Sequence, residues 1–179
     1  VTNPPIDPLG EAIVMSLEVD LGGEGNLFEE TERHARRVSL TSPILSQGKF
    51  ESILALNESG LKVQVIDATY DPEVTTLKIA LETLCQEAAA HVTGGASVLV
   101  LSDRSIAEAR LPIHSLLATG AVHHHLIAHG LRADSNLIIE TGSARDSHQV
   151  ACLLGFGATA IYPYPVSYTH LTLPTKVRV

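Results

Sequence analysis

The sequence predicts an α/β fold: a partial (half) TIM-like barrel of parallel strands with covering helices, preceded by a mostly helical and loop N-terminal arm. Three observations predict it. Short apolar segments alternate with helical periods over residues 61–164. The segments are apolar throughout, which is typical of strands buried on both faces of a parallel sheet. They number four, half of the strands in a closed (β/α)₈ barrel.

The predicted strands and helices follow one another in strict alternation. Glycines end the helical periods, as Gly94, Gly130 and Gly155 do here. The helices are expected at residues 72–91, 113–129 and 147–154. The strands are expected at residues 63–66, 97–101, 137–139 and 158–162.

The first 60 residues lack this alternation of strands and helices and are expected to be an interdomain linker and helical arm. Three prolines within residues 1–9 prevent a regular ladder there. Short helices are expected at 11–17, 29–38 and 47–56, with a glycine-rich turn at 21–26. Residues 61–164 form the expected half-barrel core, and residues 165–179 have no helical period.

Composition excludes several classes of protein. A chain of 179 residues is enough for one domain, and 45% hydrophobic residues exclude a disordered chain. Because 20 acidic residues outnumber 12 basic ones, no nucleic-acid partner is expected. No apolar run is long enough to cross a membrane, so no membrane partner is expected. Two cysteines and the lack of a signal peptide favour a reducing, cytoplasmic location, and the leading Val1 suggests a piece of a longer protein.

Polar residues follow three predicted strands, at the edge where parallel α/β folds bind ligands. Asp103 and Arg104 form either a structural ion pair or a clamp for a substrate carboxylate, and Glu140 with Arg145 allows the same two interpretations. Asp67 is expected to organise a loop or cap a helix rather than act as a general base.

Histidines 123–125 and 129 form the most unusual cluster in the chain. His125 and His129 lie four residues apart on one helix face, a spacing that metal ligands use. A zincin site requires a Glu beside the first His, and this sequence has none there. The spacing does not dictate a third metal ligand, although Glu140 or His148 could reach the same ion. The favoured interpretation is that these histidines are partly exposed and hydrogen-bonded near a helix end.

Several strings occur in an order that resembles a known family. They include Asn-Pro-Pro-Ile-Asp-Pro at 3–8, Leu-Val-Leu-Ser-Asp-Arg at 99–104 and Ala-Thr-Gly-Ala-Val-His-His-His-Leu at 118–126. Together they resemble the central domain of the glutamate synthase large subunit over residues 1–164.

The resemblance implies a role without chemistry of its own. In this family a glutamine amidotransferase domain precedes the central domain, and an FMN-binding barrel with an iron–sulfur cluster follows it. The parent enzyme makes two L-glutamate from L-glutamine, 2-oxoglutarate and reducing equivalents delivered by an electron-donor subunit or ferredoxin. This chain is therefore expected to hold no catalytic, cofactor-binding or metal-binding residue.

Residue roles also follow from the resemblance. Met15, Thr41 and Ser42 are expected at an interdomain surface or at the ammonia passage, because small or apolar walls suit ammonia. The residues expected to form a structural polar rim are Asp67, Asp103, Arg104, Glu140, His125 and His129.

The sequence departs from the family in two places. Gly10 stands where the family usually has Arg, and the family pattern ends after Tyr164. Residues 165–179 are therefore expected to be a non-native tail. The alternatives to the family role are a stand-alone half-barrel scaffold or binding module, and a small metalloenzyme using the histidine cluster.

Overall fold

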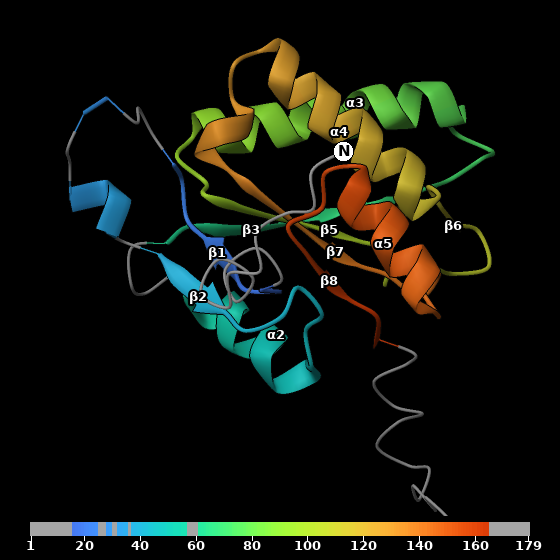
Figure 1. Ribbon diagram of the computed structural model, residues 1–179. Helices are drawn as coiled ribbons and strands as arrows, with labels where there is room; N and C mark the ends of the chain where they lie inside the picture. The colour runs from blue at the N-terminus through green and yellow to red at the C-terminus, as the bar shows by residue number, and fades with distance from the viewer. Residues whose placement is uncertain (1–15, 25–27, 30–31, 36, 57–60, 165–179) are drawn as a thin grey trace, which may run out of the picture.

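The computed structural model describes residues 16–24, 28–29, 32–35, 37–56 and 61–164. These form three layers, of which the middle one is a parallel sheet (Figure 1). The sheet contains β3 (Val63–Asp67), β5 (Val98–Ser102), β7 (Asn136–Glu140) and β8 (Ala160–Tyr162). Their order in the sheet equals their order in the chain, and every pairing is parallel. The predicted α/β half-barrel is confirmed.

Three helices cover one face of the sheet. They are α3 (Leu77–Thr93), α4 (Ser115–Ala128) and α5 (Ser147–Gly155), each of which connects one strand to the next (Figure 1). Because each crossover is right-handed and steps in the same direction across the sheet, all three helices pack on the same side. Thr76 and Asp146 cap α3 and α5 by accepting hydrogen bonds from backbone N–H groups of the first turn.

The opposite face is covered by α2 (Gln47–Leu54) and by a small antiparallel sheet of β1 (Val19–Leu21) and β2 (Val38–Leu40) (Figure 1). Residues 43–45 lie beside β8, where the Ile161 N–H donates to the Pro43 carbonyl at 2.7 Å. From there α2 leads back to β3 at the other side of the sheet. A right-handed crossover in this reverse direction places α2 on the face that a full barrel would turn inward.

The two faces bury separate apolar clusters because side chains alternate along each strand. In register, Val100 lies beside Ile138, and Ile138 lies beside Ala160, all toward α2. Phe50 of α2 stacks on Tyr162 with ring centroids 4.4 Å apart. The sheet is therefore filled on both sides, except at Val65, which is 52% exposed.

The N-terminal arm differs from the prediction. Residues 29–38 were expected to be helical, but a 3-10 turn (η1, Glu32–Ala35) precedes strand β2. Leu21 and Leu40 are buried beneath the sheet because pairing β1 with β2 lets both strands cover its apolar face. A second short pair, β4 (Thr69–Tyr70) with β6 (Leu111–Pro112), was also not predicted, nor was the 3-10 turn η3 (Arg132–Asp134).

The first covering helix starts later than predicted. Helix α3 begins at residue 77 rather than 72, because residues 71–74 form a turn in which Asp71 accepts the Glu73 N–H at 2.8 Å. The expectations for residues 1–15 and 165–179 lie outside the described residues.

Candidate functional site at the carboxyl edge of the sheet

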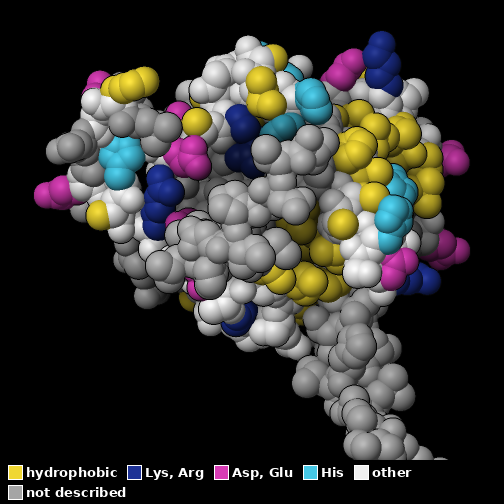
Figure 2. Space-filling view, in the orientation of Figure 1, with side chains coloured by type: hydrophobic (Ala, Val, Ile, Leu, Met, Phe, Trp, Pro, Cys, Tyr) yellow, Lys and Arg dark blue, Asp and Glu magenta, His cyan; other side chains and the backbone are white. Residues whose placement is uncertain are grey.

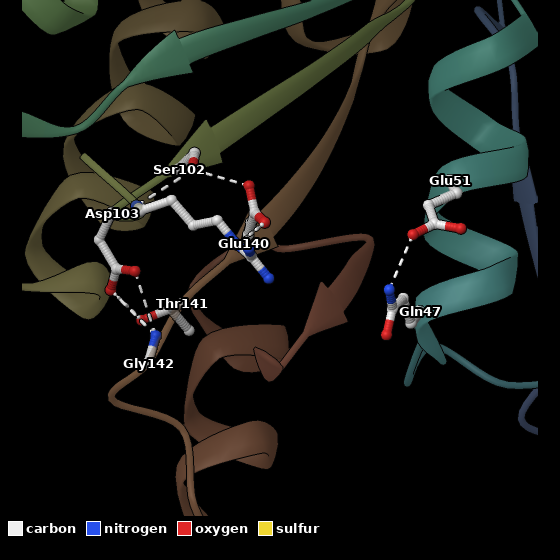
Figure 3. A network of polar contacts seen from close by, with 8 residues as sticks. Gln47, Glu51, Ser102, Asp103, Glu140, Thr141 and Gly142 are labelled. Carbon is white, nitrogen blue, oxygen red and sulfur yellow. Dashed lines mark hydrogen bonds and ion pairs between the residues drawn. The ribbon is translucent and has the colours of Figure 1, made fainter. Parts of the chain in front are cut away.

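The ends of β5 and β7 are joined through the carboxylate of Glu140, which is buried. The Ser102 hydroxyl donates to Glu140 Oε2 at 2.7 Å (Figure 3). Arg104 Nε lies 2.8 Å from Glu140 Oε1. Ser102 and Glu140 are direct partners in the strand register, which brings them together. Arg104 therefore pairs with Glu140 and not with its neighbour in sequence.

Asp103 is the second buried carboxylate of this edge, and the loop after β7 satisfies it. Thr141 Oγ1 donates to Asp103 Oδ2 at 2.6 Å, and the Gly142 N–H lies 3.1 Å from both carboxylate oxygens (Figure 3). The Asp103 backbone N–H also donates to the Glu140 carbonyl. Among the described residues, the ion pair of Glu140 is with Arg104, and the Arg145 backbone N–H donates to Gln149 Oε1 at 2.7 Å.

Tyr164 is a member of this network that sequence reasoning missed. The Arg104 guanidinium carbon lies 4.7 Å from the centroid of its ring, a cation–π contact. Burial, the negative charge of Asp103 and a hydrogen bond to Asp103 raise the pKa of Tyr164 to about 12. The phenol therefore stays protonated and can donate at neutral pH.

A hollow of about 260 Å³ opens beside this network, between the sheet and α2. Arg104 and Glu140 line it from the sheet, and Gln47 and Glu51 line it from α2, where they bond each other at 2.9 Å (Figure 3). Its volume is below the usual range of small-molecule sites. The polar groups at this edge bind one another and cross-link strand ends, which favours a structural role.

Asp67 organises the neighbouring loop, which is one of the two roles expected for it from the sequence. Its Oδ1 accepts from the Thr69 N–H at 3.0 Å and hydroxyl at 2.8 Å, and its Oδ2 lies 2.8 Å from Arg110 Nη2. These bonds fasten β4 to β6. The helix-capping alternative was wrong, since Thr76 caps α3.

His125 and His129 lie at the opposite edge of the sheet, because α4 runs antiparallel to the strands. Their ring centroids are 4.2 Å apart, and His129 Nδ1 lies 2.8 Å from the His125 carbonyl oxygen. Burial and the nearby His129 lower the pKa of His125. Among the described residues, no group of three or more His, Cys, Asp or Glu side chains is placed to hold a metal ion.

His123 packs into a separate structural cluster with Arg132 and Gly157. Arg132 Nε donates to His123 Nδ1 at 3.0 Å, and Arg132 Nη2 donates to the Gly157 carbonyl at 2.9 Å. Burial and the cation of Arg132 lower the pKa of His123, so the neutral ring accepts this bond. Gly157 has φ +110°, and its lack of a side chain makes room for the His123 ring.

The three residues expected at an interdomain surface or the ammonia passage have different surroundings. Met15 lies outside the described residues. Thr41 is exposed and accepts a hydrogen bond from Lys49 Nζ at 3.1 Å, whereas Ser42 accepts the Ile44 N–H at 3.2 Å. Thr41 lines an open hollow of about 450 Å³ between β2 and α2.

No helix among the described residues is both long and apolar enough to cross a membrane.

Comparison with known proteins identifies relatives over nearly the whole chain. The family model for the glutamate synthase central domain matches residues 1–177, which includes part of the segment 165–179. The chain is 46% identical over 169 residues to a chloroplastic ferredoxin-dependent glutamate synthase of Oryza sativa subsp. japonica, covering 92% of this chain and 10% of that protein. It is 41% identical over 170 residues to the glutamate synthase [NADPH] large chain of Bacillus subtilis, covering 95% and 11%. It is 42% identical over 168 residues to glutamate synthase [NADH] of Schizosaccharomyces pombe, covering 92% and 8%.

Proposed function

Because this chain belongs to the glutamate synthase central domain family, we propose that it connects a glutamine amidotransferase domain to an FMN-binding synthase domain and helps wall the ammonia passage between them. The chain spans about a tenth of the length of the relatives it matches. The activity of the whole protein therefore belongs to the proposal: two L-glutamate from L-glutamine, 2-oxoglutarate and reducing equivalents. The electron donor is a partner subunit or ferredoxin.

One observation carries the non-catalytic role. At the carboxyl edge, where barrel enzymes bind substrate, Asp103 and Glu140 are buried and bonded to neighbouring strand ends. The face that would line a barrel is filled by Phe50 and its neighbours on α2. This arrangement suits a rigid connector better than a catalyst.

The cofactors of the proposed parent enzyme belong to a neighbouring domain. An iron–sulfur cluster is held by several thiolates, usually four, whereas this chain has two cysteines in all. Cys85 is buried on α3 and its burial raises the pKa of the thiol, which disfavours the thiolate. The residues present therefore do not fit a cluster, and the small hollow at the carboxyl edge does not fit a flavin.

Exposed apolar side chains support contacts with neighbouring domains. Figure 2 shows hydrophobic side chains gathered on the side where α4, α5 and β6 lie. The chain exposes Ile106, Leu111 and Leu117 by 44–50% in α4 and in the segment before it. Clustered exposed apolar surface is typical of interfaces.

Thr41 offers a test of the passage. The hollow it lines is walled mainly by apolar groups, including Val38, Leu40 and Ile53, which would not trap ammonia as ammonium. Thr41→Arg in a complete large subunit carrying this domain should obstruct the passage. We expect ammonia to escape, so that glutamate formed per glutamine hydrolysed falls below that of the unaltered enzyme.

Two matched controls make the test specific. Thr41→Val keeps the size of the side chain and should keep the stoichiometry. Ala90→Arg adds the same charge at an exposed position of α3, on the other side of the sheet, and should also keep it. If Thr41→Arg leaves the glutamate yield per glutamine unchanged, with glutamine hydrolysis and flavin content intact, Thr41 does not line the passage.

A further inference from the structure

The last two turns of α4 carry a pair of histidines that the proposed function does not use. His125 and His129 occupy the same helix face, with ring centroids 4.2 Å apart and ring planes inclined by 36°. His125 is half-buried and His129 is exposed, so solvent reaches the pair. Residues four apart on a helix are neighbours, and two imidazoles at this spacing can share one ion.

The hydrogen bonding of His129 prepares it as a ligand. Its Nδ1 lies 2.8 Å from the His125 carbonyl oxygen, and a carbonyl can only accept. The proton therefore resides on Nδ1, which leaves the lone pair on Nε2 and fixes the ring orientation. Metal-binding histidines commonly donate their second nitrogen to a backbone carbonyl in this way.

We propose that His125 and His129 bind one divalent transition-metal ion, such as Zn²⁺ or Cu²⁺, through their two imidazoles. Imidazole nitrogen suits these ions, whereas Mg²⁺ and Ca²⁺ prefer oxygen ligands. Since the described residues contain no metal-binding group of three, water completes the coordination. The site is a structural clip on a helix end, distinct from the carboxyl-edge network.

Such an ion would fasten the final turn of α4 to the turn before it. His129 is the C-cap, and the chain then reverses at Gly130, whose φ is +69°. The Leu131 N–H donates back to the Leu126 carbonyl at 2.8 Å. Because the clip forms only when this turn is helical, the ion stabilises the folded chain over the unfolded one.

The test is a thermal unfolding series with Zn²⁺ on the 179-residue chain and three variants. His125→Ala and His129→Asn each remove one ligand, and Asn is well tolerated at helix ends. His124→Ala is the matched control: it removes an exposed histidine of the same helix, which bonds Gly120 and not the pair. At about ten times the Kd, Zn²⁺ should raise the Tm of the unaltered chain and His124→Ala by roughly 3–6 °C.

A spectroscopic readout keeps the result independent of folding stability. The electron paramagnetic resonance spectrum of one equivalent of Cu²⁺ should show two nitrogen ligands in the unaltered chain and His124→Ala, and one or none in the pair variants. A Zn²⁺ shift that persists in His125→Ala and His129→Asn would place the metal on other histidines and overturn the proposal. Absence of both a Zn²⁺ shift and a two-nitrogen Cu²⁺ signal in the unaltered chain would overturn it equally.

Discussion

Replacing Gly157 with alanine should destabilise the chain for two separate reasons. Its φ of +110° lies where L-residues are strained. In addition, a Cβ at this position would stand 2.3 Å from His123 Nδ1 and 2.4 Å from His123 Cγ. The ring cannot withdraw without losing the 3.0 Å hydrogen bond from Arg132.

The magnitude follows from adding these contributions. Backbone strain costs about 1–3 kcal/mol. Forcing the ring aside costs about 1–3 kcal/mol as overpacking, including the weakened bond from Arg132. We therefore expect Gly157→Ala to lower the free energy of unfolding by about 2–6 kcal/mol, which lowers the Tm by roughly 4–24 °C for a chain of this size.

Thermal unfolding followed by circular dichroism measures this effect against two matched glycines. Gly130 has φ +69° and open space around a Cβ, so Gly130→Ala carries strain alone and should cost about 1–2 kcal/mol. Gly155 has open space and ends α5, so Gly155→Ala should be neutral or stabilise by up to about 1 kcal/mol.

A double-mutant cycle separates the clash from the strain. His123→Ala empties the space, so in that background Gly157→Ala should cost only the backbone strain, about 1–3 kcal/mol. The reasoning is refuted if Gly157→Ala costs no more than Gly130→Ala, or if the costs of the His123 and Gly157 substitutions simply add.

Three further predictions concern ionisable groups at the carboxyl edge of the sheet. Glu140→Ala leaves the half-exposed Arg104 without its carboxylate and should lower the free energy of unfolding by about 2–3 kcal/mol, measured by chemical denaturation. An unchanged free energy of unfolding would mean that the ion pair does not stabilise the fold. Arg110→Ala removes an exposed pair with Asp67 and should cost about 0.2–1 kcal/mol, less at 1 M salt; a salt-independent loss would contradict an ion pair. The pKa of Tyr164 is raised to about 12, so the folded state keeps a proton that the unfolded state loses above pH 10. Its contribution to stability is complete below pH 10 and is lost as the pH rises toward 12, and Tyr164→Phe should remove a tyrosine transition near pH 12 from an absorbance titration at about 295 nm.

The repeating core was predictable because its signals are local. Residues 98–101 and 137–139 are continuously apolar, and a glycine lies at or just after the end of each covering helix. Such patterns fix where a strand or helix forms, to within one or two residues at most ends. The start of α3 was misplaced by five residues because a turn precedes its cap.

The arm was less predictable because its strands are short. β1 and β2 have three residues each, and neither has enough length for a two-residue period to stand out. They are strands because Leu21 and Leu40 find an apolar sheet face to cover. Side-chain contact with distant residues thus overrode the helical pattern at 29–38.

By itself, the sequence determined the alternation of elements, the parallel sheet and the positions of its polar edge residues. The tertiary structure decided the partners: Arg104 meets Glu140, Asp103 meets the Thr141 hydroxyl, and Tyr164 covers Arg104. Neighbours in sequence could not reveal these pairs, because the strand ends bring together residues 36–60 positions apart. Local periodicity specifies a strand, whereas the register between strands and the return of α2 across the sheet depend on burying both faces at once.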